Sequence, residues 1–391
     1  MIDPSALAGH YSRFRVGERI LLTGHSHQAW PDVGFEAQQR AWLEAAEYVD
    51  DKWSHCLEQA ERVKEGFGRL VGDIPDRIAL GTNTHELVTR WLSALPLRQR
   101  PRIVTTDREF RSLNRQLKRL AEEGVAVVET PAHPVETLAE RLAAAVTDDV
   151  ACAITSSVFF DTAEMVPRLH LIARACERVG AHFLVDAYHH LNIVPFDLAT
   201  LGLETAFVTG GGYKYCQLGE GNCFLRVPDG CRLRPLLTGW FAELSNVNAP
   251  SGGAVSYEAG AAAFAGATYD ATSHYRAAAV FAFHQEQQLT PDRLRALSRH
   301  QVGMLKRTFE QFDLDPRAAV VESVPDERRG GFLALRSPRA AGVVPLLRSE
   351  SVSVDARGDI LRVGPAPYLR DDQVRAGMEA ICRRLAARAM E

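Results

Sequence analysis

Short apolar runs alternate with longer amphipathic stretches between residues 77 and 227, and this alternation constrains the fold more than any other feature. The runs show little period-2 alternation, which is typical of strands buried on both faces. Six strands are predicted, at Ile103–Thr106, Val125–Glu129, Ala151–Thr155, His182–Asp186, Ala206–Thr209 and Cys223–Val227. Helix patterns lie between them at Ser112–Glu123, Val135–Val146 and Leu169–Val179. This repetition predicts a mostly parallel sheet wrapped by helices, an α/β fold.

The chain changes character after about residue 278. Two helix patterns, Ala278–Leu289 and the stretch that follows it to Phe309, lead into shorter strand-like runs. These runs are predicted at Ala318–Val324, Gly331–Leu335, Val352–Asp355 and Ile360–Val363, with a final helix at Asp371–Ala389. We therefore expect three parts: an N-terminal segment over residues 1–35 that contributes to the active site, a large domain over 36–280, and a smaller α+β domain over 281–391.

Composition excludes several classes of function. The formal net charge is -4 and no basic block occurs, so nucleic acid is not expected as a partner. No run of about 18 apolar residues occurs, so no membrane helix is expected. The N-terminus lacks an apolar signal core, and seven cysteines without a CxxC indicate reduced thiols. His25, His27, His55 and His85 match no standard metal-site spacing. A cytoplasmic enzyme without a metal is the favoured class.

Lys214 stands apart from the other lysines. The chain has five lysines among its 45 Lys and Arg residues, and four of them lie in charged, helix-like stretches. Lys214 instead follows a predicted buried strand within Gly-Gly-Gly-Tyr-Lys-Tyr, where glycines let the backbone approach a ligand closely. A lysine that loses solvent there lowers its pKa, as an imine-forming lysine requires. A glycine-rich turn with a surface lysine would show the same pattern.

Two other features point to the same crevice. Asp186 ends a predicted strand 28 positions before Lys214, and ligands of open α/β sheets bind at the carboxyl ends of strands. A buried carboxylate there needs a cation, which a protonated pyridine nitrogen supplies, although an ordinary strand-end Asp that caps a helix is the alternative. Residues 81–84 precede the helix pattern His85–Leu95, and such a turn either binds a phosphate or simply caps the helix.

These residues and several spaced motifs make the chain similar to pyridoxal-phosphate enzymes of the class V aminotransferase group, fold type I, and within it to kynureninases. The motifs are Asp-Ala-Tyr-His-His at 186–190, Gly-Gly-Tyr-Lys-Tyr at 211–215, the segment 22–31, Gly-Trp-Phe at 239–241 and residues 360–367. The resemblance extends over nearly the whole chain. It implies a large domain with a mostly parallel seven-stranded sheet and a homodimer whose active site is shared between subunits.

Carried over residue by residue, the resemblance implies a binding site for pyridoxal 5′-phosphate. Lys214 would hold the cofactor covalently and move the substrate Cα proton, while Asp186 would pair with the pyridinium. His189 would support that end of the ring or the ring hydroxyl. Phe110 would stack on the ring face, although a core aromatic fits its position equally well. The implied phosphate shell is Thr82, Asn83, Thr84, Ser156, Tyr213 and Trp240, with Thr268 from a second subunit.

The substrate side is implied by a second set of residues. Arg362 would bind the substrate α-carboxylate, a role suited to a planar guanidinium, and Tyr213 is the candidate proton donor. Ser26 and His25 lie in the N-terminal motif on this side.

The chain also departs from the kynureninase pattern on the substrate side. His25, His27 and Gln28 replace Asn, Leu and Gly, although Ser26 is kept. Leu113 stands where an Asp is usual, and residues 157–162 lose an Asn. Cofactor binding is therefore a firmer expectation than substrate identity.

The resemblance implies hydrolytic cleavage of the Cβ–Cγ bond of an amino-acid substrate. L-kynurenine would give anthranilate and L-alanine, and 3-hydroxykynurenine would give 3-hydroxyanthranilate, as in tryptophan catabolism. A class V aminotransferase or another lyase remains open because the same cofactor serves many reactions. A cysteine desulfurase would need a mobile cysteine before Arg362, and none lies between Cys231 and Cys382. A catalytically silent relative would bind the cofactor weakly or turn over no amine.

Overall fold

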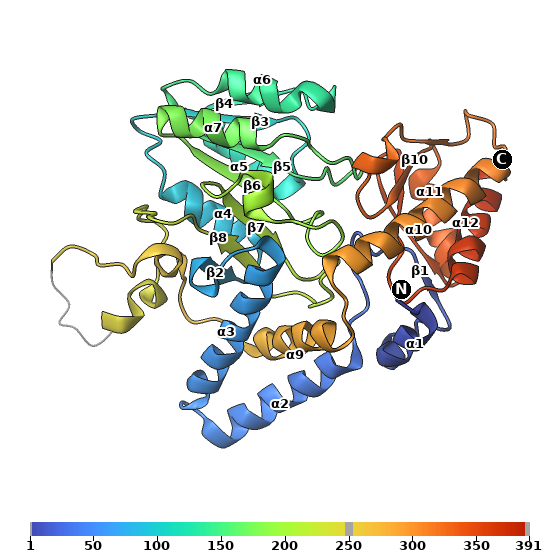
Figure 1. Cartoon of the computed structure of the whole chain (residues 1–391), viewed down its shortest axis with the longest axis horizontal. Coiled ribbons are helices and arrows are strands. Elements are labelled where there is room, and N and C mark those ends of the chain that lie inside the picture. Colours follow the sequence, from blue (N-terminus) through green and yellow to red (C-terminus); the bar gives the residue numbers. More distant parts are fainter. Residues whose placement is uncertain (1, 247–252, 388–391) are drawn as a thin grey trace.

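A seven-stranded sheet organises the larger part of the molecule (Figure 1), for which a computed structural model describes residues 2–246 and 253–387. The strand order is β2-β8-β7-β6-β5-β3-β4. β8 runs antiparallel to both of its neighbours, and the pairs from β7 to β4 are parallel. The bounds are β2 Ile78–Gly81, β3 Arg102–Thr106, β4 Ala126–Thr130, β5 Val150–Ser156, β6 His182–Asp186, β7 Phe207–Gly211 and β8 Cys223–Arg226. The predicted α/β fold with a mostly parallel seven-stranded sheet is confirmed.

Helices cover both faces of this sheet. The first face packs against α3, α6, α7 and α9, which contribute Val63, Leu138, Ile172 and Phe281 to one core. The second face packs against α4 and α5 through Leu87, Trp91, Leu113 and Leu117. The bounds are α2 Asp32–Tyr48, α3 Lys52–Val71, α4 Thr84–Ser93, α5 Arg111–Glu122, α6 Leu138–Ala145, α7 His170–Val179, α8 Leu198–Leu201 and α9 Thr272–Glu286.

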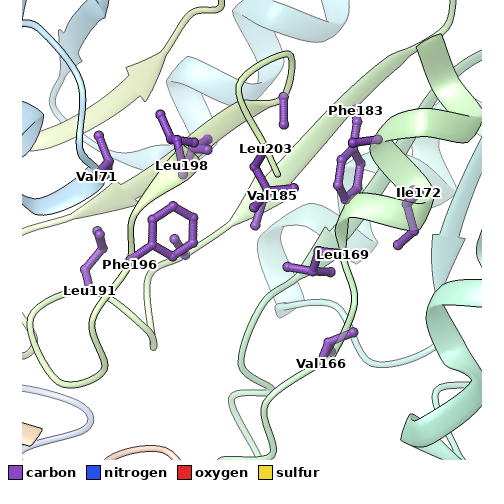
Figure 2. Close-up of a cluster of buried hydrophobic side chains, with 14 of the residues drawn as sticks. Val71, Val166, Leu169, Ile172, Phe183, Val185, Leu191, Phe196, Leu198 and Leu203 are labelled. Atoms are coloured by element: carbon purple, nitrogen blue, oxygen red, sulfur yellow. The ribbon is translucent and has the colours of Figure 1, made fainter. Parts of the chain in front are cut away.

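Strand β6 shows why its sequence lacks polar alternation. Phe183 and Val185 point into the first core, where Figure 2 shows them with Ile172 and Leu198. Leu184, between them, points into the second core. Both faces of the strand are therefore buried, so every position favours an apolar side chain.

Several predicted elements differ from the observed ones. β2, with the sequence Ile-Ala-Leu-Gly, was not predicted. β4 lies at the sheet edge with Ala126 and Glu129 exposed, so the expectation that it is buried on both faces is wrong. The predicted helix at 135–146 begins as a 3-10 turn, Val135–Thr137, before α6. α9 begins six residues earlier than predicted, at Thr272.

A second unit combines the two ends of the chain. Its four-stranded sheet, in the order β12-β13-β10-β9, packs with α10, α11 and α12, and the N-terminal segment with α1 and β1 lies against it (Figure 1). β1 pairs in parallel with β11, and Tyr11 and Leu22 join the core of this unit. The bounds are α1 Pro4–Ala8, β1 Ile20–Leu21, α10 Pro291–Gln311, β9 Val320–Val321, β10 Leu333–Arg336, α11 Ala340–Ser349, β11 Val352–Ser353, β12 Asp355–Arg357, β13 Ile360–Val363 and α12 Asp371–Ala386.

The strand predicted at 352–355 is in fact two short strands. β11 leaves the four-stranded sheet to pair with β1, whereas β12 starts the hairpin with β13. The last helix is described to Ala386, and the predicted end at residue 389 lies outside the described residues. None of the helices in the described ranges is both long and apolar enough to cross a membrane.

Candidate active site

The carboxyl ends of neighbouring parallel strands bring the predicted cofactor residues to one edge of the large sheet. β6 ends at Asp186, and its register partner at the end of β5 is Ser156. Phe110 follows β3 and precedes α5. Thr84, Phe110 and Asp186 line one narrow cavity together with Leu113. The structure therefore assembles side chains that lie far apart in the sequence.

Lys214 is buried at this edge and is only 6% exposed. Its Nζ lies 3.2 Å from Nε2 and 3.4 Å from Nδ1 of His189, and 4.3 Å from the ring centroid of Tyr188. Burial lowers the pKa of Lys214 to about 7, although Asp186 raises it. The surface-lysine alternative is therefore wrong. An amine whose pKa is lowered to about 7 is partly unprotonated at neutral pH and can act as a nucleophile or a base.

The glycine-rich turn before Lys214 is required by close packing. A Cβ at Gly211 would lie 2.4 Å from Cys223 Sγ and 2.5 Å from Tyr188 Oη. A Cβ at Gly212 would lie 2.6 Å from Leu218 Cβ. The two glycines thus make room for protein side chains, whereas the sequence led us to expect room for a ligand.

Asp186 presents a carboxylate with few partners. Its Oδ1 accepts a 2.8 Å hydrogen bond from the N–H of Tyr188, and no Lys or Arg of the described ranges forms an ion pair with it. Burial raises the pKa of this carboxyl, although the Tyr188 N–H and Lys214 lower it. The next helix, α8, begins only at Leu198 and is capped by Asp197, so the alternative that Asp186 caps a helix is wrong. A cationic ligand group would relieve the cost of burying this charge.

Aromatic side chains surround the lysine. Phe110 and Tyr213 place their ring centroids 5.5 and 5.6 Å from Lys214 Nζ. Phe110 also meets Phe160 edge to face, with the centroids 5.5 Å apart. Burial raises the pKa of Tyr213 to about 12, and His27 stacks on its ring at 4.8 Å.

His189 adds no positive charge next to Lys214. His189 is buried, and burial lowers its pKa well below the ordinary value, with Lys214 and Arg362 lowering it further. Its ring is therefore neutral near pH 7. In this structure His189 contacts Lys214, so its predicted place at the cofactor ring remains a prediction.

The turn before α4 combines capping with exposed polar groups. Asn83 is the N-cap, and its side chain accepts a 2.8 Å hydrogen bond from the N–H of Glu86. The Thr82 hydroxyl donates to Glu86 Oε2 at 2.7 Å. Thr84 lines the cavity beside Asp186. Asn83 therefore caps the helix, while Thr84 lines the cavity of the predicted cofactor region.

Trp240 and Thr268 form a separate pair. Trp240 is 46% exposed and donates from Nε1 to Thr268 Oγ1 at 3.1 Å, and Thr268 is also exposed. Their exposure leaves the prediction of a shared phosphate site between subunits open.

Ser156 donates hydrogen bonds to the carboxylate of Glu109, a residue that the sequence did not point to. The Ser156 hydroxyl donates to Glu109 Oε2 at 2.7 Å, and its N–H donates to Oε1 at 3.2 Å. Thr106 donates to the same Oε1 at 2.6 Å. Burial raises the pKa of Glu109 to about 7, although these hydrogen bonds lower it. The predicted phosphate contact of Ser156 therefore competes with a protein carboxylate.

Arg362, from the small sheet, is bound by a second missed carboxylate. Its Nε donates to Asp355 Oδ1 at 3.0 Å, its Nη2 donates to Asp355 Oδ2, and its Nη1 donates to the carbonyl of Phe160 at 2.7 Å. His25 Nε2 lies 2.7 Å from Asp355 Oδ1. Ser26, next to it, lies 3.1 Å from His27 Nδ1. Asp355 thus joins His25 and Arg362, and the role of these two residues in substrate binding remains a prediction.

A local signal could have identified Asp355. It pairs directly with Arg362 across the β12–β13 hairpin, whose turn contains Gly358 at φ +60. An opposite-charge pair seven residues apart around such a turn predicts a cross-strand ion pair. Glu109 offered no comparable signal, because its partner Ser156 lies 47 residues away at the end of β5. All seven cysteines are unpaired thiols, and the described residues contain no cluster able to hold a metal.

Comparisons with known proteins agree with this architecture. Residues 294–381 match the family model of the kynureninase C-terminal domain. An uncharacterized aminotransferase, YcbU, of Bacillus subtilis is 22% identical over 85% of this chain and 86% of its own length. A kynureninase of Bacillus thuringiensis is 25% identical over 87% of this chain and 78% of its own length.

Solved structures share the fold at low sequence identity. The lyase C-DES, with glycine covalently linked to its PLP cofactor, has a TM-score of 0.82 at 17% identity and covers 97% of this chain and 98% of its own. The apo cysteine desulfurase of Thermococcus onnurineus has a TM-score of 0.80 at 14% identity, covering 98% of each chain. The resemblance to kynureninase-like class V proteins, and the fold-type I architecture, are thereby confirmed.

Proposed function

We propose that this chain is a pyridoxal-phosphate enzyme that acts on a small amino acid and cleaves L-kynurenine, or its 3-hydroxy derivative, hydrolytically at Cβ–Cγ. The observation that carries the proposal is the buried Lys214, free of any ion pair among the described residues, beside the incompletely bonded carboxylate of Asp186. The kynureninase match of residues 294–381 supports the finer assignment.

The residues present fit this cofactor. Asp186 would hold its pyridinium nitrogen, because a second carboxylate oxygen has no protein donor in the described ranges. Phe110 and Tyr188 offer ring faces on two sides of Lys214, and Thr84 with the α4 N-terminus offers N–H and hydroxyl donors to a phosphate. When bound, the cofactor supplies an electron sink that stabilises negative charge at the substrate Cα.

The protein side chains then supply binding and proton transfer. Lys214 Nζ, whose pKa is lowered to about 7, would link to the cofactor, and it would accept the Cα proton once the substrate amine has replaced it there. Tyr213 keeps its hydroxyl proton near neutral pH, because its pKa is about 12. Its hydroxyl group is the proposed proton donor to the substrate. Arg362 makes three hydrogen bonds within the protein, which leaves two of its five N–H groups for a substrate carboxylate.

A homodimer is part of the proposal. In this dimer, the polar groups of the exposed Trp240–Thr268 pair of one subunit would reach the phosphate-binding site of the other subunit. The relatives that support the family resemblance leave transamination as a second candidate, because one of them carries the name aminotransferase.

Adding L-kynurenine to protein reconstituted with pyridoxal phosphate tests the proposal. Anthranilate fluorescence and the visible absorption band are followed together. Release of anthranilate supports hydrolytic cleavage. A changed band without anthranilate, accompanied by conversion of the cofactor to its pyridoxamine form, moves the function to transamination. Failure to develop any band overturns the cofactor assignment itself.

A further inference from the structure

Arg362, which is proposed to bind a substrate carboxylate, is already paired with the carboxylate of Asp355. Arg362 is 3% exposed and extends from β13 toward the crevice, where it contributes to the electrostatic environment of Lys214. Asp355 meets its Nε–Nη2 edge side-on, with two parallel hydrogen bonds, and both residues are register partners in one hairpin. Side-on pairs of this type fix the plane of a guanidinium.

The third bond of Arg362 comes from the large unit. Nη1 donates to the carbonyl of Phe160, which follows the end of β5. The guanidinium is thus held from two elements at once, and its two remaining N–H groups have no partner in the described residues. These two groups are the ones available to an external carboxylate.

His25 holds Asp355 from the other side. Burial lowers the pKa of His25 to about 4, although Asp355 raises it, so the ring is neutral near pH 7 and donates from Nε2 to Asp355. The ring is enclosed, with its centroid 4.7 Å from that of Phe332, and a Cβ at Gly364 would lie 2.3 Å from its Nδ1. Arg357 Nη2 lies 3.5 Å from Asp355 Oδ2 but is mostly exposed. Asp355 therefore has little freedom to turn away.

We infer that Asp355 is the positioning residue for Arg362: it occupies the Nε–Nη2 edge so that the remaining N–H groups bind the substrate carboxylate end-on. His25 keeps Asp355 in place. The inference rests on the proposed role of Arg362 in binding a substrate carboxylate. It also assigns a function to His25, a position where the chain departs from the kynureninase pattern.

A double-mutant cycle on the reconstituted enzyme tests this inference. Asp355→Asn, Arg362→Lys and the double variant are compared by the Kd for L-alanine, measured from the absorbance change of the bound cofactor. We expect Asp355→Asn to weaken L-alanine binding about tenfold or more. In the Arg362→Lys background, the same substitution should change the Kd by less than about twofold, because Asp355 acts only through the arginine. Additive losses would overturn the inference.

A second readout does not depend on a bound cofactor. The Arg362 Nε–H signal in a nitrogen-15 NMR spectrum is identified by its loss in Arg362→Lys. It should exchange slowly with solvent in the parent protein and rapidly in Asp355→Asn. Unchanged exchange in Asp355→Asn would show that the carboxylate does not hold the guanidinium.

Glu322→Gln is the matched control. Glu322 pairs with Arg336 at 2.7 Å in the same sheet, and its side chain is 18% exposed against 19% for Asp355. We expect this control to leave the L-alanine Kd unchanged. If Asp355→Asn does not fold, Asp355→Glu replaces it in the cycle, because the longer side chain cannot keep both bonds.

The outcomes separate the inference from the proposed function. Weaker L-alanine binding in Arg362→Lys with an unchanged Kd in Asp355→Asn overturns the positioning role and leaves the proposed function intact. An unchanged Kd in Arg362→Lys removes Arg362 from carboxylate binding and overturns the inference, whereas the proposed function is decided by the release of anthranilate. A lower Kd in Asp355→Asn shows that Asp355 competes with the substrate, which also overturns the inference.

Discussion

The two buried basic side chains near the sheet edge, Lys214 and Arg362, differ in their partners: a carboxylate pairs with Arg362 and none pairs with Lys214 in the described residues. Lys214, from the large unit, has a neutral histidine and aromatic rings around it, and burial lowers its pKa to about 7. Arg362, from the small unit, is paired side-on with Asp355. Although burial raises it, the bonds from His25 and Arg362 hold the pKa of Asp355 well below its usual range. An unpaired lysine suits covalent chemistry, whereas a paired arginine suits oriented binding of a carboxylate.

The largest expected effect is at the unpaired cation. Lys214→Ala removes the only amine at the sheet edge among the described residues, and we expect turnover to fall by at least about a thousandfold. Initial rates of product formation by the reconstituted protein measure this effect. Lys118→Ala, at an exposed lysine of α5, is the control and should keep full activity. Substantial turnover by Lys214→Ala would contradict the covalent role.

A smaller effect is expected at the paired cation. Arg362→Lys keeps the charge but loses the planar donor set, so we expect KM for the amino acid to rise about 10- to 100-fold while kcat changes little. Steady-state kinetics measure the split between the two constants. Arg336→Lys, in the neighbouring strand β10, should change neither constant. A loss confined to kcat would indicate that Arg362 acts on chemistry rather than on binding.

The unpaired lysine should also destabilise the cofactor-free protein in a pH-dependent way. Because the folded pKa of Lys214 is lowered from 10.5 to about 7, the folded state binds fewer protons than the unfolded state between these values. The free energy of unfolding should therefore rise with pH in this window, by roughly 1 kcal/mol per pH unit from this group.

Lys214→Met isolates this contribution. The variant should gain stability over the parent protein near pH 7 and lose that gain toward pH 10, as measured by urea denaturation. Equal gains in stability at both pH values would contradict a lowered pKa of Lys214 in the folded protein.

The smallest expected effect has the opposite sign. Burial raises the folded pKa of Glu109 from 4.5 to about 7, so the folded state binds more protons in this window and stability falls as pH rises. Glu109→Gln should therefore gain stability over the parent protein at pH 8 and little at pH 5. Thermal unfolding of the cofactor-free protein at the two pH values checks this. If the gain in stability were larger at pH 5 than at pH 8, the folded pKa of Glu109 would not be raised, and the prediction would be wrong.

The large sheet could be predicted from the sequence because its information is local. Each of its predicted strands is an apolar run of a few residues, and each crossover helix has its own period. Phe183, Leu184 and Val185 illustrate this, since consecutive apolar residues already indicate burial on both faces. The carboxyl ends of such strands meet at one edge, so the positions of Asp186 and Lys214 after two predicted strands were enough to place them together.

The small unit and the charged groups around the crevice depended on contacts that no local pattern contains. β1 pairs with β11 across more than three hundred residues, and Gly24 is packed so closely against Pro365 that a Cβ there would lie 2.3 Å from its carbonyl oxygen. Glu109 meets Ser156, and His25 meets Asp355, only because strands and loops from distant segments converge. The sequence by itself determined the parallel sheet and the position of Lys214 after one of its strands, because hydrophobic periodicity is a property of neighbouring residues. Tertiary structure alone decided which cation is paired and which is left free, because the partners of a buried charge are set by packing between segments remote in the chain.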